Sequence, residues 1–169
     1  FSFNVDYREY LQIQLTSPLV AGTNYCIEFY WSLADMSPHY VHEIGVYLSS
    51  TQTSLLQSST LPYTPQLEQT GTPLDDTTNW VLFQDQYVAT GGEEFIIIGN
   101  FRTPSNTTLG NTNISCNVLG TPSPGGCFAY YYIDDVSVVA SNSCCAPTTF
   151  IDTQTACDSY VWTDGITYT

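Results

Sequence analysis

Residues 25–31 read YCIEFYW, and this short stretch decides the fold class. In an extended chain its apolar side chains Tyr25, Ile27, Phe29 and Trp31 all fall on one face. A period of two in aromatic and β-branched residues is typical of a half-buried β-strand. The stretch therefore predicts a strand whose apolar face covers a core.

The same patterning recurs along the chain, and helical periodicity is scarce. Gly91 and Gly92 predict a hairpin turn, and residues 51–78 and 102–127 are rich in Ser, Thr, Pro and Gly, which predicts two long loops. An antiparallel β-sandwich (jelly roll) of about seven strands ending near Ala140 is the economical architecture. The further predicted strands are YLQIQL (10–15), EIGVYL (43–48), NWVLFQDQYVA (79–89), EEFIIIGNF (93–101) and FAYYYIDDVSVV (128–139).

The composition changes after the last of these strands. Residues 141–149 form a small polar segment containing Pro147, and a new strand-and-turn pattern starts at residue 150. We therefore expect a sandwich domain over 1–140, a linker over 141–149 and the start of a second small β module over 150–169.

The charge balance limits the partners that the chain can have. Arg8 and Arg102 face sixteen acidic residues, which gives a formal net charge of -14. A field of this sign repels phosphate backbones and anionic lipid, so nucleic acid is not expected as a partner. No apolar run approaches the roughly 20 residues of a membrane span, so membrane insertion is not expected either.

Six cysteines without metal-type spacing predict disulfides and an oxidising compartment, with free buried thiols as the competing interpretation. Cys116 and Cys127 bracket a turn-rich loop, and a bridge between them would contribute about 3 kcal/mol on the chain-entropy model. Two adjacent cysteines are badly placed to pair with each other, so they are expected to reach elsewhere. The pairing stays open among Cys26, Cys144, Cys145 and Cys157.

Three segments carry a family resemblance: REYLQIQLTSPLVAGTNYCIEFYWSLAD (8–35), NWVLFQDQYVATGGEEFIIIGNF (79–101) and YYYIDDVSV (130–138). Together they resemble the jelly-roll modules of large secreted surface proteins of Bacteroidetes, which are similar to carbohydrate-binding-module sandwiches. The tail ACDSYVWTDGITYT (156–169) resembles the start of the Cys-Asp-Ser-Tyr-Trp repeats in giant adhesin-like proteins of the same bacteria.

This resemblance covers most of residues 1–140 and implies a location and a role. It implies an extracellular or cell-surface protein, exported by the type IX route, with an adhesive or structural function. Modules of this kind usually have one more strand before the REYLQ segment at residues 8–12. We therefore expect the sandwich to lack its first strand, either because upstream sequence is lost or because a neighbouring chain supplies it.

Two adjacent acids, Asp134 and Asp135, lie in the predicted strand at 128–139. Successive side chains of a regular strand point to opposite faces, so the pair cannot flank one glycosidic bond with carboxyl groups about 5 to 9.5 Å apart. One acid is then expected near the edge of the core, where it needs a partner. The resemblance implies a structural calcium ion here, which suits oxygen ligands in an acidic chain; backbone N–H groups, Arg8 or Arg102 are the competing partners.

Aromatic residues make up 14% of the chain, and rings with polar edges can stack on sugars. Most aromatic residues of sandwiches are core residues or cross-strand pairs, which is the competing interpretation. Tyr40 and Tyr63, in predicted loop regions, are the candidate glycan-binding residues. The wider set of candidates is Tyr7, Tyr10, Trp31, Tyr47, Trp80 and the run 130–132.

No motif for catalysis is visible. There is no G-x-S-x-G turn, and His39 and His42 are predicted to pack in a loop. We expect a non-catalytic extracellular module of a large surface or secreted protein, serving adhesion or acting as a spacer. The alternatives are a filament subunit that accepts a strand from an identical subunit, and a glycan-binding module of a secreted hydrolase. The expected partners are neighbouring modules, identical subunits or glycans.

Overall fold

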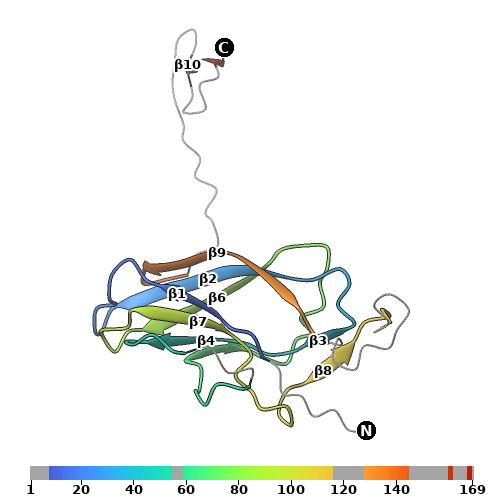
Figure 1. The fold of residues 1–169 in the computed structure, drawn as a ribbon. Helices are drawn as coiled ribbons and strands as arrows, with labels where there is room; N and C mark the ends of the chain where they lie inside the picture. Colours follow the sequence, from blue (N-terminus) through green and yellow to red (C-terminus); the bar gives the residue numbers. More distant parts are fainter. Residues whose placement is uncertain (1–7, 55–58, 116–127, 145–159, 162–166, 169) are drawn as a thin grey trace.

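The computed structural model describes residues 8–54, 59–115, 128–144, 160–161 and 167–168. Within these residues every regular element is a β-strand, and all pairs are antiparallel (Figure 1), which confirms the all-β prediction. The strands are β1 (Leu11–Gln14), β2 (Asn24–Leu33), β3 (His39–Val41), β4 (Ile44–Ser49), β5 (Leu67–Gln69), β6 (Val81–Val88), β7 (Phe95–Gly99), β8 (Leu109–Asn111), β9 (Tyr131–Ala140), β10 (Tyr160–Val161) and β11 (Thr167–Tyr168).

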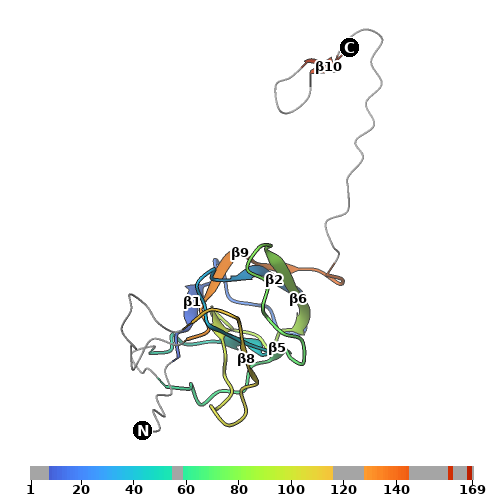
Figure 2. The ribbon, with the colours of Figure 1, turned by 90° about the vertical axis from the view of Figure 1, so that its right-hand side faces the viewer.

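Seven strands form two sheets that face each other across a core (Figure 2). The four-stranded sheet has the order β1-β7-β4-β5, and the three-stranded sheet has the order β6-β2-β9. The predicted sandwich of about seven strands ending near Ala140 is therefore confirmed, whereas its jelly-roll detail stays a prediction.

The alternation in β2 builds the core as the sequence predicts. Ile27, Phe29 and Trp31 are buried on the inner face, and the Phe29 ring stacks on Phe83 with centroids 4.6 Å apart. Trp31 meets the ring of Tyr131 edge to face at 6.0 Å. The opposite sheet contributes small apolar side chains that fill the remaining space, namely Ile44, Val46, Leu48, Ile96 and Ile98.

Strand β9 carries one extra residue relative to its partner β2. Asp134 lies opposite Tyr30, but Ser137 lies opposite Glu28, so the register shifts by one between them. Asp135 sits in this β-bulge with a φ of 51°. The bulge turns both acids toward solvent, so the prediction that one acid lies near the core edge is wrong.

The connection between β6 and β7 carries the chain from one sheet to the other. The hairpin predicted at Gly91 and Gly92 is wrong, because the strands on either side belong to different sheets. Both glycines have a positive φ (101° and 87°), and a Cβ on Gly91 would lie 2.8 Å from that of Ala21. This connection is therefore a tight corner of the sandwich.

Glu93 closes this corner with its buried carboxylate. Its Oε1 accepts hydrogen bonds from the Tyr87 hydroxyl at 2.7 Å and from the Thr90 amide and hydroxyl at 2.8 and 2.6 Å. Its Oε2 accepts one from the Gly91 amide at 2.9 Å. Burial by itself raises the pKa of Glu93, but the hydrogen bonds from Thr90 and Tyr87 outweigh it and lower the pKa to about 2.

Three short strands lie in regions predicted as loops or as lead-in to a strand. β5 falls within residues 51–78 and pairs with β4, and β8 falls within 102–127 and pairs with β3. Each of the three has only three residues, too few to show a period of two. The prediction of two strand-free loops is therefore wrong in part.

Strands β10 and β11 pair with each other, with Tyr160 opposite Tyr168. They lie in the region predicted as a second β module. The predicted boundaries at residues 140 and 150 stay predictions.

Candidate functional site

The outer face of the three-stranded sheet carries a group of aromatic side chains, which we call the outer aromatic face: Tyr30, Trp80, Tyr130 and Tyr132. Trp80, Tyr130 and Tyr132 are 50%, 54% and 52% exposed. The rings of Tyr130 and Tyr132 meet edge to face with centroids 6.1 Å apart. Large rings that are half exposed together form a contiguous surface rather than isolated exposed residues.

Strand register places these side chains on one face. Tyr131 and Ile133 pack against the core, so Tyr130 and Tyr132 point outward from the same strand. Val81 also packs against the core, so Trp80, one residue earlier, turns to the outer side. The sheet therefore collects rings that lie about 50 residues apart in sequence.

The outer face of the other sheet is built differently, because residues 59–66 cover it. Leu61, Ile97 and Phe101 form a second buried cluster there, with exposures of 5%, 0% and 6%. The rings of Tyr47 and Tyr63 stack nearly parallel, 4.5 Å apart, against this cluster. Only the three-stranded sheet leaves its described aromatic side chains open on the outside.

The two predicted glycan-binding tyrosines lie in different places, away from the outer aromatic face. Tyr63 belongs to the covering segment just described. Tyr40 lies in β3, stacks on His42 at 5.8 Å and fills the space above Gly110, where a Cβ would collide with its ring. Both tyrosines are partly buried and pack on neighbours, and their predicted role in glycan binding stays a prediction.

Asp134 and Asp135 are exposed at the bulge of β9. Oδ1 of Asp134 accepts a hydrogen bond from the amide of Asp135 at 2.8 Å, which stabilises the bulge. Among the described residues no group of three or more His, Cys, Asp or Glu side chains is placed to hold a metal ion. Calcium at this position stays a prediction, and its further ligands would have to come from backbone or amide oxygens.

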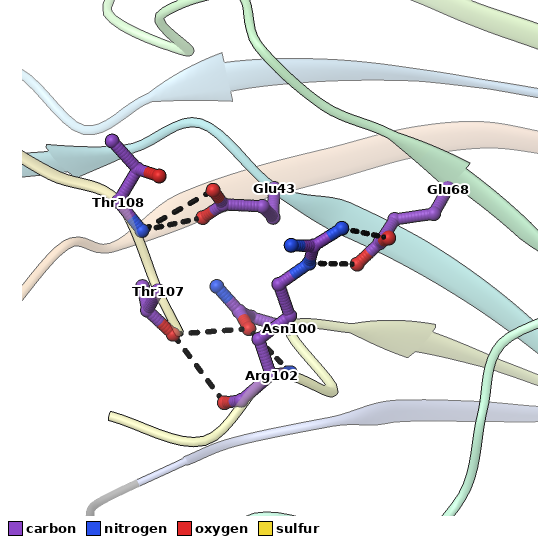
Figure 3. A network of polar contacts seen from close by, with 6 residues as sticks. All are labelled: Glu43, Glu68, Asn100, Arg102, Thr107 and Thr108. Carbon is purple, nitrogen blue, oxygen red and sulfur yellow. Dashed lines mark hydrogen bonds and ion pairs between the residues drawn. The ribbon is translucent and has the colours of Figure 1, made fainter. Parts of the chain in front are cut away.

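The richest polar cluster lies beside β4 and β5, at the opposite end of the chemistry (Figure 3). The Arg102 guanidinium donates two hydrogen bonds to Glu68, at 2.9 and 2.7 Å. The buried carboxylate of Glu43 accepts the amide of Thr108 at 2.9 Å, and Asn100 Oδ1 accepts the amide of Arg102 at 2.8 Å. These contacts fix residues 100–108 against the sheet.

This polar cluster has the character of structural support. The hydrogen bonds to Glu68 raise the pKa of Arg102, so its charge persists at every ordinary pH. Arg8 also reaches this cluster, since it donates to the Thr107 hydroxyl at 3.2 Å. The two cationic side chains predicted as possible partners of Asp134 and Asp135 are therefore engaged here instead.

The structure pairs Cys26 with Cys144, with Cα atoms 5.1 Å apart. This agrees with the expectation that one of the adjacent cysteines reaches Cys26. The bond joins β2 to the segment directly after β9. The other four cysteines, including the predicted Cys116–Cys127 bridge, lie outside the described residues: Cys116, Cys127, Cys145 and Cys157.

The outer aromatic face is a site that sequence reasoning missed. Trp80 and the tyrosine run stood among the candidate rings, but alternation alone does not say which face of a strand is covered. The one available signal was that Tyr130 and Tyr132 share a parity opposite to Tyr131. The packing of Trp80 beside them depends on the pairing of β6 with β2, which local sequence does not encode.

No protein-family model matches the chain, and no curated protein or solved structure is significantly similar to it. The resemblance to Bacteroidetes surface modules therefore stays a prediction from the residues that carry it. In the described part of the chain, no helix has the length and apolar character needed to cross a bilayer.

Proposed function

We propose that the chain is a non-catalytic module of an extracellular or cell-surface protein and that it serves adhesion through its outer aromatic face. The observation that carries this proposal is the open group of Trp80, Tyr130 and Tyr132 on one sheet. Tyrosine and tryptophan supply much contact area at little entropic cost and are enriched among residues that dominate binding energy.

The disulfide supports the extracellular part of the proposal. Cys26 and Cys144 form a bond that closes a loop of 118 residues around the whole sandwich. Structural disulfides persist in oxidising compartments and are rare where thiols are kept reduced. Its position after β9 also braces the end of the sandwich from which the chain continues.

The state of the described carboxylates supports a role without catalysis. Glu93 holds a corner, Glu68 holds Arg102 and Glu43 holds the amide of Thr108. Asp134 and Asp135 share a bulge rather than a cleft. Acid–base or nucleophilic catalysis needs paired groups around a reacting atom, and these carboxylates are engaged in fixing the backbone.

Bead adhesion tests the proposed function. Beads coated with the native chain, a Trp80→Ala/Tyr132→Ala double variant or a Leu109→Ala variant are passed over polysaccharide, protein and bacterial-cell surfaces. Leu109 is 57% exposed on β8 and provides a matched control for loss of exposed apolar area. We expect native and Leu109→Ala beads to adhere to at least one surface and the double variant to be washed off.

Either of two results would overturn the proposal. Native beads that adhere to none of the surfaces would remove the adhesive role. Double-variant beads that adhere as well as native beads would show that the contact surface lies elsewhere.

A filament built by strand addition is the second candidate, because the ten-residue β9 pairs only with β2 among the described residues. An open edge of this length can accept a strand from another chain. The bulge at Asp135 breaks the regular edge near its middle, which disfavours a long added strand. Light scattering after size exclusion, with electron microscopy, decides: fibres that survive dilution favour the filament, and monomers exclude it.

A further inference from the structure

The outer aromatic face has a regular layout set by strand pairing. In the pairing of β2 with β6, Trp31 lies opposite Val81, so the next outward position, Ser32, lies between Trp80 and Tyr132. Adjacent strands are about 4.8 Å apart, which puts the Cα atoms of Trp80 and Tyr132 roughly 10 Å from each other. Two rings therefore stand on either side of a small residue.

The next outward row repeats the arrangement with polar groups. Tyr30 lies between Leu82 and Asp134. One row further, Gln84 Nε2 donates to Glu28 Oε2 across the strands at 2.9 Å. The face thus combines rings with carboxylate and amide oxygens that accept hydrogen bonds.

Charge narrows the class of partner. The charged side chains on the outward positions of these rows are Glu28 and Asp134, both acidic. Arg8 and Arg102, the only Arg or Lys residues of the chain, contact the polar cluster beside β4 and β5. A polyanion would meet repulsion here, whereas a neutral ligand rich in hydroxyl donors would match the acceptors.

We infer that the outer aromatic face binds a neutral polysaccharide. Trp80 and Tyr132 stack on sugar rings, with their separation matched to rings that are not adjacent along an extended chain, and Tyr30 contacts the sugar between them. Hydroxyl groups of the sugar donate hydrogen bonds to Glu28 and Asp134. This inference rests on the proposed adhesive function and names the ligand class of the same site.

Affinity electrophoresis tests the inference with defined probes. Native gels contain hydroxyethylcellulose, xyloglucan, galactomannan or β-1,3-glucan as neutral polymers, and alginate or heparin as polyanions. We expect at least one neutral polymer to retard the native chain and Leu109→Ala, and the polyanions to leave it unretarded. Trp80→Ala and Tyr132→Ala each raise Kd about tenfold or more, because each removes a stacking ring.

Conservative variants separate stacking from general damage. Trp80→Phe and Tyr132→Phe keep a ring, so they are expected to retain most of the retardation that the alanine variants lose. Equal loss in the phenylalanine and alanine variants would overturn the stacking role.

The outcomes also separate this inference from the function on which it rests. Ring-dependent adhesion of the beads, without retardation by any of the four neutral polymers, would overturn the polysaccharide and leave the adhesive role standing. Stronger retardation by alginate or heparin than by the neutral polymers would overturn the inference as well. Absence of both adhesion and retardation would overturn the function and the inference together.

Discussion

The two outer faces of the sandwich carry similar aromatic side chains and treat them in opposite ways. On the four-stranded sheet, residues 59–66 fold over Tyr47 and Ile97 and bury the latter completely. On the three-stranded sheet, Tyr130 and Tyr132 remain more than half exposed. The chain can cover an outer face when stability is the only requirement, so the open face is best explained by a partner.

The first way to break this contrast is to remove the disulfide, because Cys26 is an outward-facing residue of β2 that Cys144 helps to bury. The bond closes a loop of 118 residues, so the Cys26→Ser/Cys144→Ser variant should lose about 4 kcal/mol of unfolding free energy. Urea unfolding of the variant and the native chain measures the loss. A variant as stable as the native protein would show that the bond does not constrain the unfolded chain.

The covered face should respond to the next change. Ile97→Ala removes a fully buried side chain beneath the covering segment and should cost about 3 kcal/mol. The same urea measurement checks it, with Leu11→Ala as a control, because Leu11 is 42% exposed on the neighbouring β1. A loss below that of the control would mean that the covering segment packs loosely.

The corner between the two sheets supplies a pH-dependent effect. The folded pKa of Glu93 is about 2, below its ordinary value of 4.5, so its contribution is complete above 4.5 and disappears as the pH falls toward 2. Glu93→Gln should therefore cost about 2 kcal/mol at neutral pH and flatten the loss of stability between pH 5 and 2.

Thermal melts across this pH range test the Glu93 prediction. Glu94→Gln serves as the control, since the neighbouring side chain is less buried. Parallel pH profiles of native protein and Glu93→Gln would contradict it.

Much of the sandwich could be predicted from local pattern. The alternation in residues 25–31 and 43–48 identified β2 and β4, because one face of each is apolar and the sheet period is two. The bulge could not be predicted, because it depends on how β9 meets β2 over ten residues. Strict alternation across Asp134 and Asp135 therefore gave them opposite faces, whereas the extra residue exposes both.

The candidate site depends even more on pairing between distant strands. Tyr63 and Trp80 are similar in sequence context, since both lie in polar segments rich in Thr. Only the fold stacks Tyr63 on Tyr47 and leaves Trp80 open beside β2. Sequence pattern can propose a pool of aromatic residues, but strand register decides which of them share a surface.

The smallest stability effect should come from the open face itself. Tyr132→Ala and Trp80→Ala remove rings that are about half exposed, so each should change the unfolding free energy by less than about 1 kcal/mol. Urea unfolding beside Ile97→Ala makes the comparison direct, because both experiments remove a large side chain from the outside of a sheet. A loss near 3 kcal/mol for Tyr132→Ala would mean that this ring supports the fold, and the explanation of the open face by a partner would fail. A small loss combined with lost adhesion would instead place the role of the ring in binding, because the side chain would then contribute little to stability and much to contact.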